Sequence, residues 1–555
     1  MPIYARTISA LEKCFMDEKI EWKPILERGE ALRGEEYSFE IAYTTDEIKH
    51  YPKREFQITI ESPLKDYITM RTVEQIPVRM PCYFDADDNY LRKTPGLYPD
   101  TLRPINSSNT AYFTYGELKS FFVTVDVPVD AAPGDYPIKV TFDKEYEGIY
   151  STSVEFTLHV IDAVLPEQEM KVTEWFHSDC IANYYEIDVW SDKHFEYIGK
   201  FMKCAVKNGI NMILMPIFTP PLDTAWGGER LTTQLIGVRE TEDGWEFDFT
   251  LLRRWVELAK ECGVKYHEIA HFYSQWGAAR APKIMGYDKS GEFRRLFGWE
   301  TEALSDEYRG FLRALIPAML DEFKKLGIDK DCVFHISDEP ALEHLEHYTR
   351  AREQVADLLE GYVIMDALSD FEFYKTGALP NPIPSNDHIV PFIEAGVENL
   401  WTYYCCGQGK DVSNRFLAMP MARTRIMGAQ MWKYKIAGFL QWGFNFYSSQ
   451  NSVDPINPFM GADNDYFVPA GDTYAVLPGP HGEPWETLHM KGFTMALQDM
   501  RAMYLAEKLS SREEVMAILE SEGEVTFAKY PHSAAWLLDM RAKINRIIEN
   551  AAENK

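Results

Sequence analysis

The sequence predicts a multidomain chain in which an N-terminal antiparallel β-sandwich precedes a (β/α)8 TIM barrel with a helical C-terminal tail. The 555 residues exceed what one hydrophobic core serves, because domains usually hold about 100–250 residues. Short strand-like runs fill residues 35–165, and from there strand-like runs alternate with helix-length segments. We therefore expect a sandwich domain at 1–165, a barrel domain at 166–510 and a helical tail at 511–555.

The sandwich is predicted by runs of β-branched and aromatic residues separated by turn signals such as Pro-Gly-Asp at 133–135. These runs lie at 36–43, 54–61, 66–73, 120–129, 135–142 and 152–161. Several short strands at this spacing are typical of an antiparallel sandwich.

The barrel is predicted by about eight β/α units that begin after Leu165–Pro166, where strand-like runs start to alternate with helix-length segments. Strand-like runs lie at 171–179, 211–218, 264–273, 332–340, 362–368, 388–396, 399–406 and 438–447, and helix-length segments at 194–209, 251–263, 307–327, 341–361 and 421–435. A doubly wound sheet is the alternative, but no glycine-rich phosphate loop follows the first strand. The charged tail is expected to pack on the barrel or on the sandwich.

Charge and cysteine usage limit the classes of partner. Lys and Arg total 57 against 86 Asp and Glu, and the resulting net charge of −29 repels nucleic acids and anionic lipid surfaces. The sequence shows neither a signal peptide nor an apolar stretch of about 18 residues. The eight cysteines are scattered without a CxxC pair, which predicts reduced thiols and a cytoplasmic protein.

The segment HISDEP, at 335–340, carries the most specific chemistry. Asp338 and Glu339 close an apolar strand, and catalytic groups of such barrels lie at the carboxyl ends of the strands. Two carboxylates in one partly dry pocket push their pKa values apart, so that one stays protonated, as glycosidic cleavage requires. The alternative is that both acids merely cap the following helix.

The segment HEIAH, with His267, Glu268 and His271, has the literal spacing of a zinc-protease motif, which requires a helix. Its surroundings predict a strand, where positions four apart lie about 13 Å from each other and cannot share one metal. We therefore expect no metal and no cofactor. We expect these histidines to contact sugar hydroxyls or to lie satisfied in the core.

Aromatic and polar side chains at the strand ends are candidates for binding a sugar, because rings stack on a pyranose face and polar groups reach hydroxyls. The candidates are His177, His271, His335, Trp401, Tyr403, Tyr404, Trp442 and Asn445. Core packing stays open as the alternative for each aromatic residue.

Over nearly its whole length the chain resembles glycoside hydrolase family 123, the β-N-acetylgalactosaminidases, and the wider group of proteins that share its barrel. The resemblance rests on PGLYPDTLRPI at 95–105, VPVDAAPGDYPIKVTF at 127–142, HISDEP, the Trp/Tyr-rich strand at 399–406, GFLQWGFNFY at 438–447 and GDTYAVLPGP at 471–480. It implies a retaining, substrate-assisted reaction. By that resemblance Asp338 orients the 2-acetamido group of the substrate and Glu339 is the general acid/base.

The expected function is therefore exo-hydrolysis of a terminal β-linked N-acetylhexosamine, with N-acetylgalactosamine as the favoured sugar. The expected partner is a carbohydrate, not a nucleic acid or a membrane, and a homo-oligomer is compatible with the sequence. One competing hypothesis is a glycosidase that pairs Asp338 or Glu339 with Asp366 or Asp370 on a sugar without an acetamido group. The other is a carbohydrate-binding protein without catalysis.

Overall fold

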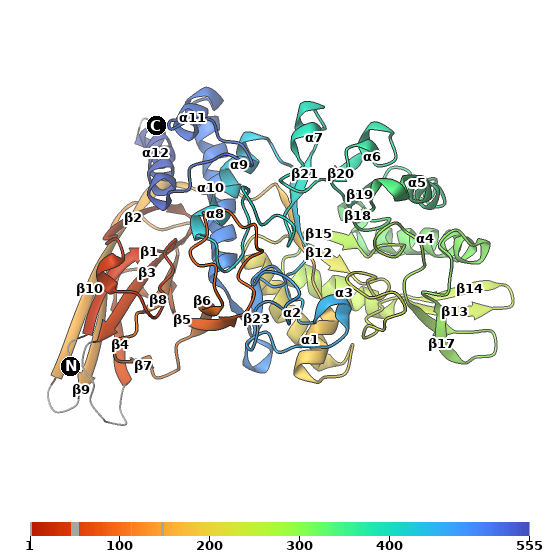
Figure 1. The fold of residues 1–555 in the computed structure, drawn as a ribbon, viewed down its shortest axis with the longest axis horizontal. Coiled ribbons are helices and arrows are strands. Elements are labelled where there is room, and N and C mark those ends of the chain that lie inside the picture. The colour runs from red at the N-terminus through yellow and green to blue at the C-terminus, as the bar shows by residue number, and fades with distance from the viewer. Residues whose placement is uncertain (1–2, 46–54, 113, 146–148, 554–555) are drawn as a thin grey trace.

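The computed structural model describes residues 3–45, 55–112, 114–145 and 149–553. Figure 1 shows a β-sandwich on the left and a barrel on the right, with helix α10 (Leu488–Leu509) running between them. The predicted fold class is confirmed: a sheet-rich N-terminal region, a nearly closed parallel barrel and a helical C-terminal tail. The domain boundaries after residues 165 and 510 remain a proposal.

The sandwich consists of two five-stranded sheets. In sheet order the first holds β1 (Ile3–Ser9), β3 (Glu36–Thr45), β8 (Lys119–Asp126), β5 (Ile68–Val78) and β6 (Gly96–Pro104). The second holds β2 (Arg28–Arg33), β10 (Ile149–Val164), β9 (Gly134–Glu145), β4 (Glu55–Glu61) and β7 (Thr110–Tyr112). The pairing is antiparallel except between β2 and β10, which run parallel.

Aromatic side chains join the two sheets. Phe39 of the first sheet stacks on Phe156 of the second with ring centroids 4.1 Å apart. Phe121 and Phe142 stack across the same gap at 5.6 Å. All four rings are buried, so the alternation seen in the sequence buries one face of each sheet against the other.

The barrel has eight parallel strands that follow one another around the ring in chain order. They are β11 (Lys171–Glu174), β12 (Met212–Met215), β15 (Tyr266–Ile269), β18 (Cys332–Phe334), β19 (Val363–Ala367), β20 (Asn381–Ile383), β21 (Trp401–Tyr403) and β22 (Gly438–Gln441). An isolated bridge between Ser385 and Tyr403 links β20 to β21. The ring is thus nearly closed through the three-residue strand β20. The sixth strand predicted at 388–396 is wrong, because the structure has helix α7 (Val390–Glu394) there and the strand lies earlier, at 381–383.

Helices follow the barrel strands and continue into the tail. They are α1 (Ser178–Tyr185), α2 (Asp192–Lys207), α3 (Thr250–Glu261), α4 (Asp306–Leu326), α5 (Leu345–Glu353), α6 (Glu372–Lys375), α7 (Val390–Glu394), α8 (Met421–Arg425), α9 (Met427–Lys433), α10, α11 (Arg512–Leu519) and α12 (Ala534–Glu553). The predicted helix at 341–361 is wrong in length, because residues 354–361 form turns, with bonds such as Leu358 N to Val355 O (3.1 Å). Among the described residues, no helix is long and apolar enough to span a bilayer.

Two small sheets extend the strand-end loops. β13 (Gly237–Thr241) and β14 (Gly244–Asp248) form a hairpin after β12, and β16 (Ile284–Tyr287) and β17 (Phe293–Phe297) form a hairpin after β15. β13 pairs with β16, which joins the two hairpins into one sheet. β23 (Val476–Pro478) and β24 (Pro484–Glu486) form a hairpin after β22.

The tail holds the sandwich and the barrel together. Arg541 of α12 donates to Glu35 of the sandwich (2.7 Å) and to Asp499 of α10 (2.8 Å), and all three side chains are buried. Lys491 of α10 pairs with Glu36 at 2.9 Å. The tail therefore contacts both neighbours, and the two parts share a polar interface.

Candidate active site

A cavity of about 180 Å³ opens at the carboxyl ends of the barrel strands. Its wall is made of Trp175, Leu222, Asp223, Gln275, Trp276, Asp338, Glu339, Ala367, Tyr403, Cys405, Cys406, Leu440, Trp442, Gln450, Asn451 and Phe467. Both predicted catalytic carboxylates lie in this wall. Its position is the one at which barrel enzymes carry their chemistry.

Asp338 and Glu339 face the same cavity because the backbone turns sharply between them. Glu339 has a φ of 41°, in the left-handed region that residues other than glycine seldom adopt. The turn is fixed by Trp276 N, which donates to Asp338 O (2.8 Å), and by Glu339 N, which donates to Ala367 O (3.0 Å). Such a conformation costs roughly 1–3 kcal/mol and typically marks a functional site. Without it, strand alternation would direct the two side chains to opposite faces.

The two carboxylates have different neighbours. Gln275 Nε2 donates to Asp338 Oδ2 (2.7 Å), and Gln275 Oε1 accepts from Asp223 N (2.6 Å). Tyr403 donates its hydroxyl to Glu339 Oε1 (2.7 Å). Asp338 is only 4% exposed, whereas Glu339 is half-buried and keeps contact with solvent through the cavity.

Burial and mutual repulsion favour the protonated forms of this pair. Burial, and then the Glu339 charge, hold the pKa of Asp338 well above its usual value, while the Gln275 hydrogen bond opposes them. Burial also raises the pKa of Glu339, against the hydrogen bond from Tyr403. A proton on Glu339 removes one cause of the raised Asp338 pKa, so one proton shared by the pair leaves the other group free to ionise.

Behind the pair, a buried cation holds the end of β18. Burial disfavours the charged ring of His335, but Asp366 and Glu268 outweigh it and raise the pKa of His335 to about 10. Its Nδ1 donates to Asp366 (3.1 Å) and its Nε2 to Glu268 (2.8 Å). Asp366 also accepts the backbone N–H of Ile336 (3.0 Å), which fixes the chain just before Asp338. Glu268 in turn accepts from Trp175 Nε1 in the cavity wall (2.8 Å).

The cluster of His271, His335 and Asp366 has the residue types of a metal site, with ligand atoms within 4.8 Å of one another. Both ring nitrogens of His335, however, donate protons to carboxylates, and a metal would need one of those lone pairs. His271 stacks on His335 at 4.5 Å, and its ring nitrogens have no hydrogen-bond partner among the described residues. Burial, and then the charge of His335, hold the pKa of His271 well below its usual value. These features fit a neutral ring packed on a cation better than a metal centre.

A second buried network orients Trp442. Its Nε1 donates to Asp472 Oδ2 (2.7 Å). Burial raises the pKa of Asp472 to about 7, although Arg415 opposes the shift. Arg415 donates to Asp472 O (3.0 Å) and pairs with Glu174 (2.8 Å). Asp472 belongs to the segment at 471–480 that carried part of the family resemblance.

Of the eight predicted sugar-binding residues, the structure places Tyr403 and Trp442 in the cavity wall. The other six, His177, His271, His335, Trp401, Tyr404 and Asn445, are buried elsewhere.

Hydrogen bonds explain why His177 and Asn445 are not in the cavity wall. His177 donates to Trp442 O and accepts from Arg230, both at 2.8 Å. Asn445 bonds the His177 backbone through both its amide atoms.

The two remaining aromatic residues, Trp401 and Tyr404, are kept out of the cavity wall by their positions in and just after β21. Trp401 lies over Gly438 of the neighbouring strand, where a side chain would collide with it. Side chains alternate along a strand, so Tyr404 points away from the face that Tyr403 occupies. It packs against Phe439 of β22 and Phe493 of α10.

Several wall residues were not among the predicted ligands. Asp223, Gln450, Asn451 and Phe467 belong to irregular loops after β12 and β22, where no sequence periodicity identifies them. Asp223 is 8% exposed with a φ of 42°, and its Oδ2 has no partner among the described residues. Burial raises the pKa of Asp223 to about 6, while Arg230 opposes the shift.

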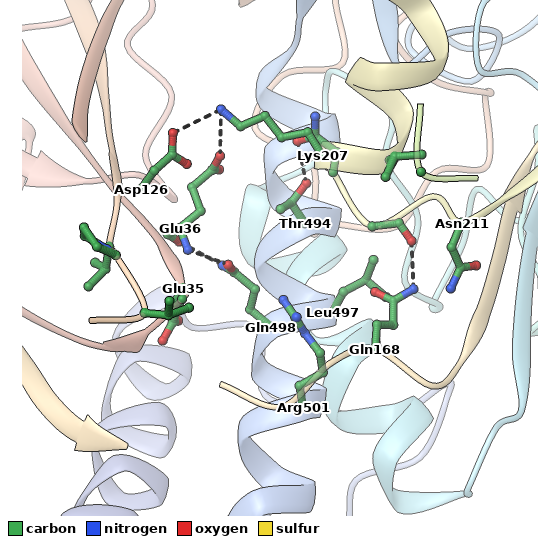
Figure 2. A pocket seen from close by; sticks show the side chains of 18 of the residues that line it. Glu35, Glu36, Asp126, Gln168, Lys207, Asn211, Thr494, Leu497, Gln498 and Arg501 are labelled. Atoms are coloured by element: carbon green, nitrogen blue, oxygen red, sulfur yellow. Dashed lines mark hydrogen bonds and ion pairs between the residues drawn. The ribbon is translucent and has the colours of Figure 1, made fainter. Parts of the chain in front are cut away.

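A larger cavity, about 520 Å³, lies between the sandwich and the opposite end of the barrel (Figure 2). Its acids are already paired: Lys207 reaches across to Asp126 (3.3 Å) and Glu36 (3.7 Å), as Figure 2 shows. Gln498 bonds both backbone groups of Glu36. Because its polar groups serve the interface and it faces the amino ends of the strands, we do not assign catalysis to it.

Two comparisons with known proteins give matches that extend over more than half of the chain. A family model described as glycoside hydrolase 123, catalytic domain, matches residues 175–506. A solved structure of a family 123 glycoside hydrolase from Clostridium perfringens, described in terms of glycolipid glycan hydrolysis, superposes with a TM-score of 0.71 at 14% identity, covering 100% of this chain and 98% of that one. At that identity the likeness shows the fold alone.

Other similarities are weaker. A Bacteroides ovatus GH5 xyloglucanase covers 85% of this chain and 98% of its own at 8% identity, with a TM-score of 0.25. A structure described as a putative β-galactosidase from Bacteroides fragilis covers 83% of this chain and 58% of its own at 10% identity, with a TM-score of 0.31. These scores carry no argument. No curated protein matches the sequence.

Proposed function

The chain belongs to glycoside hydrolase family 123, and from that premise we propose that it removes a terminal β-linked N-acetylhexosamine, N-acetylgalactosamine by preference, with retention of configuration. The observation that carries the proposal is the Asp338–Glu339 pair, which shares one small cavity but has separate partners. Because the similar Clostridium perfringens structure concerns glycolipid glycans, we include such glycans among the substrates to test.

We assign the acid/base role to Glu339. It is half-buried, open to the cavity, and burial raises its pKa, so it holds a proton for the leaving oxygen. After the glycosidic bond breaks, the same carboxylate accepts a proton from the water that enters.

We assign the role of orienting the substrate to Asp338, which lies deeper and is fixed by Gln275. An acetamido oxygen held behind the anomeric carbon is an internal nucleophile with a high effective concentration. The Asp338 carboxylate then accepts the acetamido N–H and stabilises the positive oxazolinium that forms. The proton on Glu339 favours this ionised state of Asp338, since the Glu339 charge is one of the causes that raise the Asp338 pKa.

The size of the cavity favours release of one sugar at a time. Its volume of about 180 Å³ is below the roughly 300–1,000 Å³ of pockets that take drug-sized ligands, and suits a single ring. Trp175 and Trp442 offer aromatic faces, and the unpartnered Oδ2 of Asp223 is suited to accept a sugar hydroxyl.

The competing mechanism that pairs Asp338 or Glu339 with Asp366 or Asp370 would need that further acid in the cavity. Asp366 is occupied by His335, Tyr348 and backbone N–H groups, and Asp370 accepts from Glu372 N at the start of α6 (3.0 Å). Neither lies in the cavity wall, where Asp223 is the acid present besides Asp338 and Glu339.

Substrate requirement tests the proposal. Nitrophenyl N-acetyl-β-galactosaminide should be cleaved and the β-galactoside without the acetamido group should not, and a thiazoline analogue of the bicyclic intermediate should inhibit strongly. Asp338→Asn should lower the rate on the acetamido substrate. Cleavage of both glycosides at similar rates, with a fluorosugar adduct on an Asp or Glu, would refute substrate assistance.

The cytoplasm remains our proposed location, on the basis of cysteine spacing in the sequence. Fractionation of producing cells tests it.

A further inference from the structure

Two adjacent cysteines, Cys405 and Cys406, lie in the wall of the cavity just after β21 ends. Both are half-buried and unpaired, and the exposed Gly407 follows them. Cys405 is two residues beyond Tyr403, so strand alternation places it on the cavity side, and Cys406 also reaches the wall because the strand has ended. A small reagent that enters the cavity therefore contacts both residues.

The two thiols interact with each other. A hydrogen bond with Cys406, followed by burial, holds the pKa of Cys405 well above its usual value. Neighbouring Cα atoms lie about 3.8 Å apart across a trans peptide, closer than the roughly 4.4–6.8 Å of an ordinary disulfide. A disulfide between them would close a small ring and twist the joining peptide. Strained disulfides of this kind are easily reduced, and labile or regulatory disulfides belong to this class.

The peptide that such a ring would twist is bonded to the cavity wall. Asp472 accepts the backbone N–H of Cys406 as well as Trp442 Nε1 (2.7 Å). Cys405 N donates to Gln408 Oε1 (2.9 Å), and Cys405 O accepts from Asn414 Nδ2 (2.8 Å). Rotation of this peptide would break the Cys406 bond to Asp472, the residue that also positions Trp442.

The same rotation would reach the catalytic pair. The peptide lies two residues after Tyr403, whose hydroxyl donates to Glu339. The two sulfurs therefore lie next to the residues that position a sugar-binding face and the proposed acid.

We propose that Cys405 and Cys406 form a reversible oxidation site, at which a peroxide joins the two sulfurs and thereby disables the cavity. The Cys405 Sγ donates to Gln408 Oε1 (3.3 Å), so we place the first step on Cys406, which becomes a sulfenic acid while the peroxide O–O bond breaks and one water leaves. The Cys405 sulfur then attacks the oxidised sulfur, the S–S bond forms, and the departing oxygen leaves as a second water. Two thiols are oxidised and one peroxide is reduced. The loss of activity rests on the proposed function, whereas formation of the bond does not.

Mass spectrometry of the full chain tests the site. After treatment with hydrogen peroxide and then iodoacetamide, the peptide that contains Cys405 and Cys406 should lack two hydrogens and carry no alkyl group, and dithiothreitol should reverse both changes. Cys405→Ser should form no disulfide, and dimedone should capture a sulfenic acid on Cys406. Cys82→Ser, which removes a half-buried single cysteine and leaves the pair intact, should form the disulfide as the parent does.

Activity is followed in parallel on nitrophenyl N-acetyl-β-galactosaminide, and it should fall in step with the disulfide fraction and recover with dithiothreitol. Full alkylation of both cysteines after peroxide would overturn the site. A disulfide that leaves activity unchanged would overturn its effect on the cavity, as would equal peroxide sensitivity in the double variant Cys405→Ser, Cys406→Ser. A parent that cleaves no glycoside would count against the proposed function alone, because the mass measurement still decides whether the bond forms.

Discussion

Replacing Tyr403 with phenylalanine should shift the alkaline limb of the pH–rate profile upward by about 1–2 units. The Tyr403 hydroxyl donates to Glu339 Oε1 at 2.7 Å, and this bond stabilises the ionised carboxylate. A hydrogen bond to a charged group contributes about 1.5–3 kcal/mol, and one pKa unit corresponds to about 1.36 kcal/mol. Deleting the donor therefore raises the Glu339 pKa by about 1–2 units. Glu339 then stays protonated, and competent as an acid, to a higher pH.

The measurement is kcat against pH for the parent and for Tyr403→Phe on an oligosaccharide that ends in β-linked N-acetylgalactosamine, whose unactivated leaving group needs the proton from Glu339. Tyr404→Phe is the matched control, because the Tyr404 hydroxyl is buried without a hydrogen-bond partner among the described residues and the ring packs away from the cavity. The control should keep the parent profile. An alkaline limb that stays in place or moves downward in Tyr403→Phe would show that Glu339 is not the group whose protonation limits the rate.

Four further results are expected. Glu339→Gln should slow cleavage of natural oligosaccharides by about 10²–10⁴-fold and affect an activated aryl glycoside less; unchanged turnover of oligosaccharides would contradict the acid role. Asp223→Asn should raise KM by about tenfold near neutral pH. Burial raises the Asp223 pKa to about 6, so the KM difference between variant and parent should disappear as the pH falls below 6. A KM difference that does not change with pH would contradict this. His335→Gln should destabilise the fold by about 3–5 kcal/mol near neutral pH, seen as a lower melting temperature, because Glu268 and Asp366 lose their buried cation. The His335 pKa is raised to about 10, so the charged ring stabilises the fold fully below about pH 6.5, and this stabilisation is lost as the pH rises through 10. The difference in melting temperature between parent and variant should therefore narrow over that pH range. A difference that widens would refute the charge assigned to His335. Dialysis against EDTA should leave activity intact, whereas stoichiometric zinc whose removal abolishes activity would refute the protonated state of His335.

The sequence predicted the architecture well wherever a strand or helix was long enough to show its period. The alternating run at 36–43 lies in β3, the run at 120–129 matches β8 as far as Asp126, and the helix at 307–327 corresponds to α4. Prediction failed at short elements. β20 spans three residues, and its place in the ring depends on pairing with neighbours and not on its own pattern.

The sequence by itself determined the fold class and singled out Asp338 and Glu339, because apolar periodicity and a pair of acids at a strand end are local properties of the chain. Only the tertiary structure decided that both acids face one cavity, through the left-handed backbone at Glu339 and its bond to Ala367. It also separated Tyr403, in the cavity, from Tyr404, in the core, and it brought Asp223 and Gln275 to the site from different loops. These outcomes depend on which surfaces meet when strands distant in sequence pair, and neither composition nor spacing encodes that directly.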